Sequence, residues 1–449
     1  MADAKADALE ELDRRLEAGT ARVGVIGLGY VGVPLACAFV RQSIATTGFD
    51  IDPAKISQIA AGENYLHSVD MAPLTAGLAD GRFEATADFA RLAACDAILI
   101  CVPTPLTPQR EPDLSYVEAT ARAIAASLRP GQLVVLESTT YPGTTREVVR
   151  PILDATGLTS GKDYLLAYSP EREDPGNATH SVARIPKVIG GDGEAARAAA
   201  LALYRPIVPD LVPVSSTDTA EAVKLTENIF RSVNIALVNE LKLIYERMGI
   251  DIWEVIEAAK TKPFGYMPFY PGPGLGGHCI PIDPFYLTWR ARSFDAATRF
   301  VELAGEINTA MPYHVVDRLA DALGRLAGRS LYGSRILILG AAYKKNVADV
   351  RESPALKIMQ ILGERGAEWE FHDPHVAALP RTRRHPELNG RAGVPLDAET
   401  LARCQAVLIC TDHDAVDYGL VARHAAIVVD TRNALASRGL APRPTVVSA

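Results

Sequence analysis

The sequence predicts an α/β protein with two doubly wound domains joined by a long central helix. Near the N-terminus, a short β-branched strand runs into a glycine-rich turn and then into a helical pattern, over residues 22–40. The second half of the chain repeats this outline, because RVGVIGLG at 22–29 is echoed by RILILGAA at 335–342. Between the halves, residues 216–248 contain neither glycine nor proline, so one unbroken helix fits them.

Length and composition agree with a globular protein of several domains. The 449 residues are too many for one ordinary domain, and 48% hydrophobic with 22% charged residues is an ordinary globular balance. The formal net charge of -8 argues against a surface for nucleic acid or anionic membranes, although a local basic pocket for phosphates stays open. We expect neither nucleic acid nor a membrane as a partner.

The cysteines and the N-terminal segment indicate the compartment. The six cysteines form no C-x-x-C pair and no disulfide-like framework, which fits a reducing environment. The segment up to Gly19 is charged and helix-forming, with acids among its basic residues, unlike a signal or transit peptide. No apolar run reaches the length of a membrane span. We therefore expect a cytoplasmic protein.

The first glycine-rich turn has the pattern of a dinucleotide site. A G-x-G-x-x-G run lies between the predicted strand and helix, and the next strand ends in an aspartate about 20 residues further on. The glycines permit a tight turn, a close approach of a pyrophosphate and close helix–strand packing. The aspartate suits a ribose diol and repels a 2′-phosphate, so NAD is favoured over NADP. The predicted cofactor residues here are Gly27, Gly29, Tyr30, Val31, Gly32 and Asp50.

Two further strands, Ala97 to Val102 and Leu133 to Glu137, end in threonine-rich turns. The carboxyl ends of parallel strands form the edge where ligands bind in open α/β sheets. Thr104 and Thr139 in these turns are therefore candidate contacts for cofactor or substrate. The alternative is ordinary turn chemistry, in which threonine is common.

In the second half, the corresponding first turn reads GAAYKKNVADVRESP at 340–354 and lacks the three-glycine pattern. A second NAD is therefore not expected. Lys344, Lys345 and Arg351 bring cations toward this edge instead, which suits another ligand that carries phosphate. The alternative for each of them is ordinary surface charge.

The central helix has an apolar face and a polar stripe. Its polar residues Lys224, Asn228 and Arg231 recur at i, i+4 and i+7. Such a stripe is usually a solvated face, but the asparagine is a modest helix former and invites a functional interpretation. The apolar positions, which suit domain packing or a subunit interface, are Leu225, Ile229, Ala236, Leu237, Leu241, Ile244 and Met248.

Two loops carry the remaining candidates. The glycine- and proline-rich loop 271–283 presents Cys279, either as a nucleophile for a carbonyl carbon or as a buried free thiol. Asp283 ends this loop and also suits a helix N-cap before Pro284. His278 has no partner at metal-ligand spacing, so no metal is expected. The acidic turn 168–176 offers Glu171 and Glu173 for acid–base work, or is a solvated loop.

Seven motifs in order make the chain resemble the UDP-glucose/GDP-mannose dehydrogenase family. They are GLGYVGVPLA, CVPTP, STTYPGTT, SPERE, KLTENIFRSVNIALVNE, PGPGLGGHCIPIDPFYL and AYKKNVADVRESPA. The match leaves out little beyond the N-terminal helix, and chance does not supply seven ordered motifs. A sensing or structural protein with two such domains is the other class considered, but loss of the nucleophile, lysine or glycine pattern would mark it, and all three are present.

The resemblance implies roles for individual residues. Cys279 would be the nucleophile, Lys224 and Asn228 would stabilise oxyanions at C6 of the sugar, and Asp283 would assist the water. Thr139 and Glu171 would hold the catalytic water and support proton transfer. The C-terminal domain would bind UDP. The implied substrate residues are Glu171, Arg172, Lys224, Asn228, Gly276, His278, Lys344 and Arg351.

The resemblance also implies a reaction, an assembly and domain limits. The reaction would be a four-electron oxidation at C6 of a UDP-sugar by NAD, through a thiohemiacetal and a thioester, to make a polysaccharide precursor. The phrases GGHCIPIDP and SPEREDPGN favour UDP-N-acetyl-D-glucosamine, with UDP-N-acetylmannosamine, UDP-N-acetylgalactosamine or UDP-glucose as alternatives. A homodimer or higher homo-oligomer is expected. The expected domains are 1–20 (N-terminal helix), 21–210 (NAD-binding), 211–325 (central, helical) and 326–449 (UDP-binding).

Overall fold

The computed structural model describes residues 2–66, 69–107, 109–172, 185–277, 280–382, 384–440 and 446–449. The chain forms two compact units, which we call the first unit (Met1–Glu227 with Phe285–Ala297) and the second unit (Asn228–Pro284 with Thr298–Ala449). The boundary falls inside the long helix α8, Thr217–Arg247. The first unit therefore also contains a segment from much later in the chain, residues 285–297.

The described residues of the first unit form an eight-stranded sheet in the order β3-β2-β1-β4-β5-β6-β7-β8. All described strand pairs are parallel except β6 with β7. Strand β1 lies between β2 and β4, so the strand order reverses there and leaves a ligand crevice at the carboxyl ends of β1 and β4. The strands are β1 (Val23–Ile26), β2 (Thr46–Phe49), β3 (Phe83–Thr86), β4 (Ala97–Ile100), β5 (Leu133–Leu136), β6 (Leu165–Tyr168), β7 (Lys187–Gly191) and β8 (Leu211–Val214).

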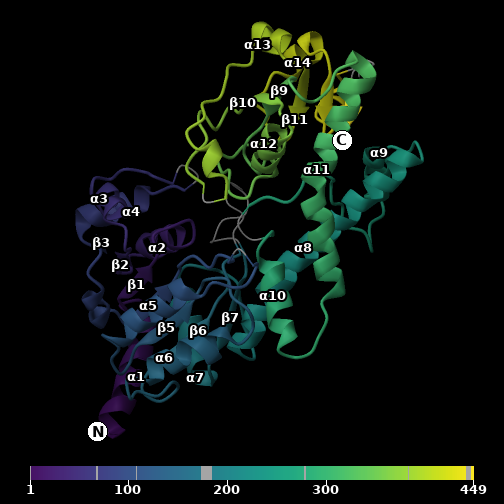
Figure 1. Cartoon of the computed structure of the whole chain (residues 1–449). Coiled ribbons are helices and arrows are strands. Elements are labelled where there is room, and N and C mark those ends of the chain that lie inside the picture. The colour runs from purple at the N-terminus through teal and green to yellow at the C-terminus, as the bar shows by residue number, and fades with distance from the viewer. Residues whose placement is uncertain are drawn as a thin grey trace. The chain divides into compact units, whose positions relative to one another are not determined.

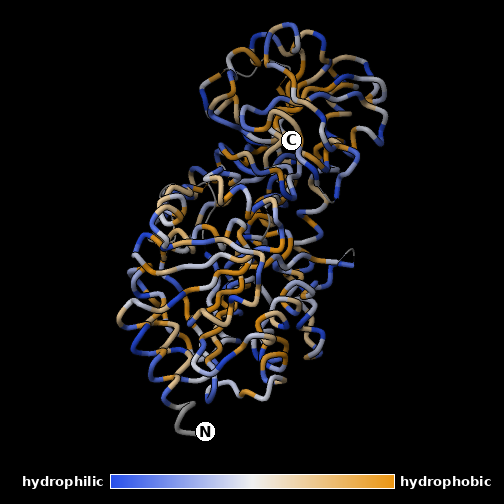
Figure 2. The backbone as a smooth tube through the Cα atoms, turned by 90° about the vertical axis from the view of Figure 1, so that its left-hand side faces the viewer, coloured by the Kyte–Doolittle hydropathy of each residue, from blue (hydrophilic) through white to orange (hydrophobic). Residues whose placement is uncertain are grey.

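Both faces of this sheet are covered, because its central strands β1, β4, β5 and β6 are buried at every position rather than at every second one. Val23 and Val25 of β1 join a core with helices α1 (Ala2–Glu17), α2 (Gly32–Arg41) and α7 (Glu194–Tyr204). Their neighbour Ile26 joins the opposite core with α5 (Ser115–Ala125) and α6 (Arg150–Asp154). Figure 1 labels these strands and helices, and Figure 2 shows hydrophobic segments running through the middle of the unit.

Helix α1 is anchored on the first unit. Leu12 and Leu16 are buried in the first of these cores, beside α7. Arg15 forms an ion pair of 3.2 Å with the buried Asp96 at the start of β4. The unit also contains α3 (Pro53–Ala60), α4 (Ala72–Asp80), the short helices η1 (Phe89–Ala94) and η2 (Thr145–Val149), and most of α10 (Asp283–Arg292).

The second unit carries a five-stranded sheet in its described residues, with all pairs parallel and the order β10-β9-β11-β12-β13. Strand β9 lies between β10 and β11, so this sheet also has a crevice at the carboxyl ends of two neighbouring strands. Its strands are β9 (Arg335–Leu339), β10 (Glu368–His372), β11 (Ala406–Ile409), β12 (Val428–Asp430) and β13 (Val446–Ser448). Its helices are α9 (Ile252–Ala259), α11 (Arg299–Ala327), α12 (Pro354–Glu364), α13 (Ala398–Arg403), α14 (Tyr418–His424), η4 (Pro386–Leu388) and η5 (Ala436–Arg438).

The predicted fold class is confirmed. The two echoed segments form β1 and β9, each at the point where the strand order of its sheet reverses, and one helix of 31 residues occupies the predicted central position. The strands predicted to end at Val102 and Glu137 end at Ile100 and Leu136. The four expected domain limits stay a prediction. Within the described ranges, no helix is both long and apolar enough to span a membrane.

Candidate functional site

The glycine-rich turn after β1 needs its glycines for two physical reasons. Gly27 has φ +94, and a Cβ there would lie 2.5 Å from the carbonyl oxygen of Cys101. A Cβ on Gly32 would lie 2.0 Å from the carbonyl oxygen of Gly27. Gly29 differs, because no described heavy atom lies within 4 Å of its Cβ position. The turn is therefore tightly packed on the protein side and open at Gly29, as a backbone that receives a phosphate group must be.

Asp50 lies buried directly after β2, where the prediction placed it. Its carboxylate accepts hydrogen bonds from the N–H groups of Leu28 and Asp52, both at 2.9 Å, and from Lys55 Nζ at 2.9 Å. The bond from Leu28 links the acid to the glycine-rich turn. A carboxylate has about four acceptor positions, so these three bonds fix Asp50 and leave capacity for a ribose hydroxyl. Tyr30 and Val31 are half-buried between Gly29 and the start of α2.

The structure brings the two threonine-rich turns together. Ser138 Oγ donates to the carbonyl oxygen of Val102 at 2.8 Å, which joins the segment after β5 to the segment after β4. Thr104 is buried, and its carbonyl oxygen accepts from Tyr286 Oη at 2.8 Å. Thr139 is half-buried beside Ser138. Both candidate threonines therefore lie at the same edge of the sheet as the glycine-rich turn.

Lys224 and the segment after β6 lie together in the first unit. Lys224 is 7% exposed, and its ammonium group donates to the carbonyl oxygen of Glu171. The next residue, Arg172, pairs with Glu227 of α8 at 2.6 Å and donates to the carbonyl oxygen of Pro186 at 2.5 Å. Residues 171–172 are thus held against α8. Glu173 lies outside the described residues.

Asn228 and Asp283 form a buried polar pair in the second unit. They are 4% and 2% exposed, and Asn228 Nδ2 donates to Asp283 Oδ2 at 2.5 Å. Asp283 is the first residue of α10 and is followed by Pro284, so the acid stands in the first turn of that helix. The acid therefore occupies a helix start and also contacts the amide of α8.

The glycine-rich loop 271–277 packs against the first turn of the second unit's sheet. A Cβ on Gly276 would lie 2.6 Å from Cβ of Tyr343. The N–H of Gly277 donates to the carbonyl oxygen of Arg351 at 3.0 Å, and the side chain of Arg351 binds Asp349 with a shortest distance of 2.6 Å. Lys344, next to Tyr343, is half-buried. The structure thus brings together Gly276, Lys344 and Arg351, whereas His278 and Cys279 lie outside the described residues.

The five described cysteines have no disulfide partner, and all are buried. Burial raises the pKa of each thiol, to about 12 for Cys37, Cys95 and Cys410 and to about 11 for Cys404. The pKa of Cys101 also lies well above its ordinary value because that thiol is fully buried. None of these five thiols is suited to act as a thiolate nucleophile near neutral pH.

In the second unit, Asp373 corresponds to Asp50. Hydrogen bonds from the chain itself occupy the acceptor positions of its carboxylate. In the described structure Asp373 Oδ2 accepts from the N–H groups of Ala341 and Ala342 at 2.8 and 3.0 Å and from His413 Nε2 at 3.1 Å. Its Oδ1 accepts two further backbone N–H groups at 2.8 and 3.1 Å. Burial opposes ionisation, but these donors outweigh it and hold the pKa of Asp373 below its ordinary value. Little acceptor capacity remains for a ribose, in keeping with the missing glycine pattern.

Sequence reasoning missed two buried acids of the first unit. Glu137, directly after β5, pairs with Lys187 Nζ at 2.8 Å and accepts a hydrogen bond from Tyr204 Oη. A charged residue at the end of the run LVVLE is the signal that was available for it. Glu221 on α8 is fully buried against residues 143–145. No sequence pattern separates Glu221 from the solvated acids around it.

Comparisons with known proteins match this architecture domain by domain. Models of the UDP-glucose/GDP-mannose dehydrogenase family match residues 21–208 (NAD binding domain), 218–310 (central domain) and 337–437 (UDP binding domain). The UDP-N-acetyl-D-glucosamine 6-dehydrogenase of Pseudomonas aeruginosa is 37% identical over 361 residues, covering 80% of this chain and 83% of that protein. The NDP-N-acetyl-D-galactosaminuronic acid dehydrogenase of Ralstonia nicotianae is 34% identical over 441 residues, covering 96% of this chain and 100% of that protein.

A solved structure agrees with these matches. The structure of the UDP-D-ManNAc dehydrogenase of Pyrococcus horikoshii superposes with a TM-score of 0.84 at 33% identity, covering 95% of this chain and 98% of that one. The NAD site is therefore assigned to the first sheet. This assignment rests on the glycine-rich turn, on the family matches, and on Asp373 of the second sheet, whose acceptor positions are already occupied. The chain belongs to the UDP-glucose/GDP-mannose dehydrogenase family and is an NAD-dependent oxidoreductase with a UDP-binding domain.

Proposed function

We propose that this protein oxidises the C6 hydroxyl of UDP-N-acetyl-D-glucosamine to the carboxylate, in two steps at one carbon and without release of the aldehyde. The observation that carries the proposal is the burial of Lys224 and Asn228 one turn apart on α8, with Asn228 bonded to Asp283. An ammonium, an amide and a carboxylate are expensive to bury unless they act on a ligand or on one another. Asp283 follows Cys279 by four residues.

NAD supplies the hydride acceptor for each of the two oxidations. In the first, the chain removes the hydroxyl proton at C6, with Glu171 and Thr139 holding the water that receives it. The Cys279 thiolate then adds to the aldehyde carbon to form a thiohemiacetal, whose oxidation leaves a thioester. Water held near Asp283 hydrolyses the thioester and frees the thiol and the carboxylate. The balance is one alcohol, two NAD and one water to one carboxylate, two NADH and three protons.

Lys224 and Asn228 are assigned to the charge that develops on the C6 oxygen. A cation and an amide donor that are already fixed before reaction stabilise such an oxyanion by a few kcal/mol each, on the order of 10²–10³ in rate. Support comes from the bond between Lys224 and the Glu171 carbonyl, which holds the ammonium group in place. The five described cysteines, with raised thiol pKa values, leave Cys279 as the candidate nucleophile.

The UDP moiety is assigned to the second unit. Lys344 and Arg351 come from the first turn of its sheet, and Gly276 and His278 come from the segment 271–283. In the first unit, Glu171 and Arg172 after β6 are the further proposed substrate residues. The packing of Gly276 on Tyr343 supports the first part of this assignment. The named relatives act on different UDP- or NDP-sugars, so UDP-N-acetylmannosamine, UDP-N-acetylgalactosamine and UDP-glucose are the alternatives to be compared.

The test is the number of NADH molecules formed per UDP-N-acetylglucosamine consumed, at limiting sugar and excess NAD. Two are expected, and one would mean that oxidation stops at the aldehyde. Cys279→Ala should abolish uronate formation while NAD binding survives, and normal turnover in that variant would overturn the mechanism. Values of kcat/KM for the four UDP-sugars, measured side by side, decide the sugar. A larger value for another sugar would replace UDP-N-acetylglucosamine.

We also propose a homodimer that uses the outer face of α8, and a cytoplasmic location. Phe230, Leu237 and Ile244 recur every seven residues on that helix and are 49%, 49% and 46% exposed. A row of exposed apolar side chains at this spacing suits a second helix. Leu237→Glu should give monomers in light scattering after size exclusion, whereas dimers of unchanged stability would exclude this face. The proposed location is supported by the five described cysteines, which have no disulfide partner, and by the need for NAD.

A further inference from the structure

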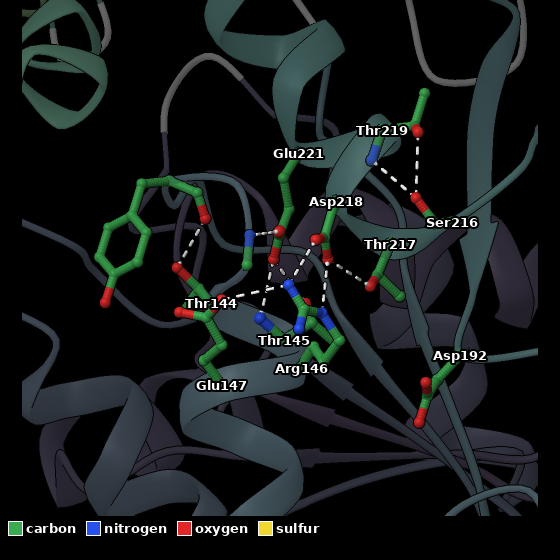
Figure 3. Close-up of polar contacts among 12 residues, drawn as sticks. Thr144, Thr145, Arg146, Glu147, Asp192, Ser216, Thr217, Asp218, Thr219 and Glu221 are labelled. Atoms are coloured by element: carbon green, nitrogen blue, oxygen red, sulfur yellow. Dashed lines mark hydrogen bonds and ion pairs between the residues drawn. The ribbon is translucent and has the colours of Figure 1, made fainter. Parts of the chain in front are cut away.

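Glu221 is a buried carboxylate that belongs to one helix and caps another. It lies in the second turn of α8 and is fully buried. In the described chain its oxygens accept from the N–H of Gly143 at 2.6 Å, the N–H of Thr145 at 2.8 Å and Thr145 Oγ1 at 2.7 Å (Figure 3). Thr145 begins the helical run η2, so Glu221 supplies the negative charge favoured at a helix N-terminus.

These bonds anchor one end of a turn whose other end is anchored at the sheet. The turn 138–145 begins at Ser138, which is bonded to the carbonyl oxygen of Val102 at 2.8 Å. It ends at the residues that Glu221 binds, and Thr144 Oγ1 closes it internally by donating to the carbonyl oxygen of Tyr141 at 2.7 Å. Thr139, a proposed active-site residue, lies between the two anchors. Its position is therefore set by β4 at one end and by α8 at the other.

Lys224 lies three residues after Glu221 on the same buried face of α8. We propose that Glu221 is a positioning residue, whose ionised carboxylate locks the turn 138–145 onto α8 and thereby fixes Thr139 relative to Lys224. The inference rests on the proposed function, in which both of those residues serve the reaction. Glu221 itself touches neither substrate nor cofactor in this scheme.

The carboxyl group of Glu221 changes its charge near neutral pH. Burial raises its pKa, the bonds from Thr145 and Gly143 lower it, and the balance is a pKa of about 7. Protonation converts one acceptor oxygen into a donor, so at least one of the three bonds is lost and the turn is held less firmly. The titratable and charged groups around this site are Asp218 on α8, Tyr141 in the turn, Arg146 and Glu147 on η2, and Arg290 on α10, which pairs with Glu147 at 2.6 Å.

Four substitutions separate positioning from general stability. Glu221→Gln keeps the size of the side chain but removes its charge and one acceptor. Thr145→Val removes only the hydroxyl bond, and Thr145→Ser restores it. Asp218→Asn is the matched control, because Asp218 joins the same two elements one turn earlier through an exposed ion pair of 2.9 Å with Arg146. An exposed pair of this kind contributes little to stability, because solvent screens it.

The experiment measures kcat, KM for NAD and the pH profile of kcat with the full-length protein. Glu221→Gln should lower kcat about 10- to 100-fold, as expected for a misplacement of the order of 1 Å, with KM for NAD changed less than about twofold. Thr145→Val should lower kcat less, and Asp218→Asn should resemble wild type. The wild-type kcat should rise through pH 7, and Glu221→Gln should lose that rise. If Glu221→Gln does not fold, the Thr145 pair carries the test.

Several outcomes would overturn the inference. The first is a wild-type kcat and pH profile in Glu221→Gln. The second is an equal loss of kcat in Glu221→Gln and Asp218→Asn. The third is a loss of kcat and of NAD binding in proportion to the loss of thermal stability. Amide hydrogen exchange over residues 138–145 is read without turnover, and its protection should fall in Glu221→Gln. If wild type oxidises no UDP-sugar, the proposed function fails, while this exchange measurement still decides whether Glu221 holds the turn.

Discussion

At the scale of single residues, the three glycines of the first turn have different roles, and the sequence pattern alone does not distinguish them. Gly27 and Gly32 have backbone atoms of the protein where a side chain would go, whereas Gly29 has open space. The same substitution should therefore damage the fold at one position and ligand binding at another.

We predict that Gly29→Ala weakens NAD binding by about tenfold or more, because a methyl group obstructs the approach of the pyrophosphate. Its melting temperature should stay at the wild-type value. Gly27→Ala should instead lower the melting temperature, because its Cβ would lie 2.5 Å from the Cys101 carbonyl oxygen at a positive φ. Titration of NAD and thermal melts of both variants check this. Equal melting temperatures for the two variants would contradict it.

Burial also changes the ionisation of one lysine, Lys242. Lys242 is 2% exposed, and among the described residues its Nζ finds no hydrogen-bond partner. Burial lowers its pKa to about 8, although Glu246 and Asp430 act in the opposite direction. Lys242 is therefore charged up to about pH 10 in the unfolded chain but only up to about pH 8 in the folded one. The free energy of unfolding should therefore rise with pH between these two limits.

We predict that Lys242→Met stabilises the protein at pH 7 by up to about 3 kcal/mol. The gain should shrink as pH rises from 8 to 10, since wild type then folds without a buried charge. Urea unfolding at several pH values measures this. Lys162→Met is the control at an exposed site and should leave the pH dependence unchanged. A destabilised Lys242→Met protein at pH 7 would show that the ammonium group has a stabilising partner.

At the scale of elements, α8 is notable because its buried face is partly polar. Seven polar residues of this helix are buried, namely Thr217, Glu221, Lys224, Asn228, Ser232, Asn239 and Lys242. Of the apolar positions that the sequence suggested for packing, Leu225 and Ala236 are buried, whereas Leu237, Ile244 and Met248 are exposed. Tertiary packing overrides the usual amphipathic pattern here, since the helix presents polar groups to loops rather than to a hydrophobic core.

One of these contacts predicts the behaviour of the loop 271–277. Asn239 Oδ1 accepts from the N–H of Gly272 at 3.0 Å, and its Nδ2 donates to Asn308 of α11 at 3.1 Å. Asn239→Leu should cost about 1–3 kcal/mol, because it leaves a buried N–H without a partner. UDP binding should weaken while NAD binding stays unchanged, and calorimetric titration with each nucleotide measures this. Asn234→Leu, at a half-buried position of α8 whose amide donates to the Phe230 carbonyl of the same helix, is the control.

At the scale of the whole molecule, the sequence was sufficient for the two sheets and for the motifs at their edges. Hydrophobic runs and glycine turns predicted the two doubly wound sheets, and Gly27, Asp50, Thr104 and Thr139 all lie at the edge that the strands predict. The positions of Glu221 and Lys187 could not be foreseen. Their burial depends on contacts between segments far apart in the chain, and no local pattern encodes these.

The return of residues 285–297 to the first unit has a consequence for how the protein is made. A ribosome that has released residues up to Glu227 has completed the eight-stranded sheet but not the segment that supplies Tyr286, Trp289 and Arg290. Tyr286 binds the Thr104 carbonyl at 2.8 Å, and the rings of Trp289 and Tyr141 lie 4.9 Å apart. During synthesis, the turns after β4 and β5 therefore lack these contacts until about 60 further residues have been made. The nascent first unit should stay open to protease at these turns until residue 297 has emerged.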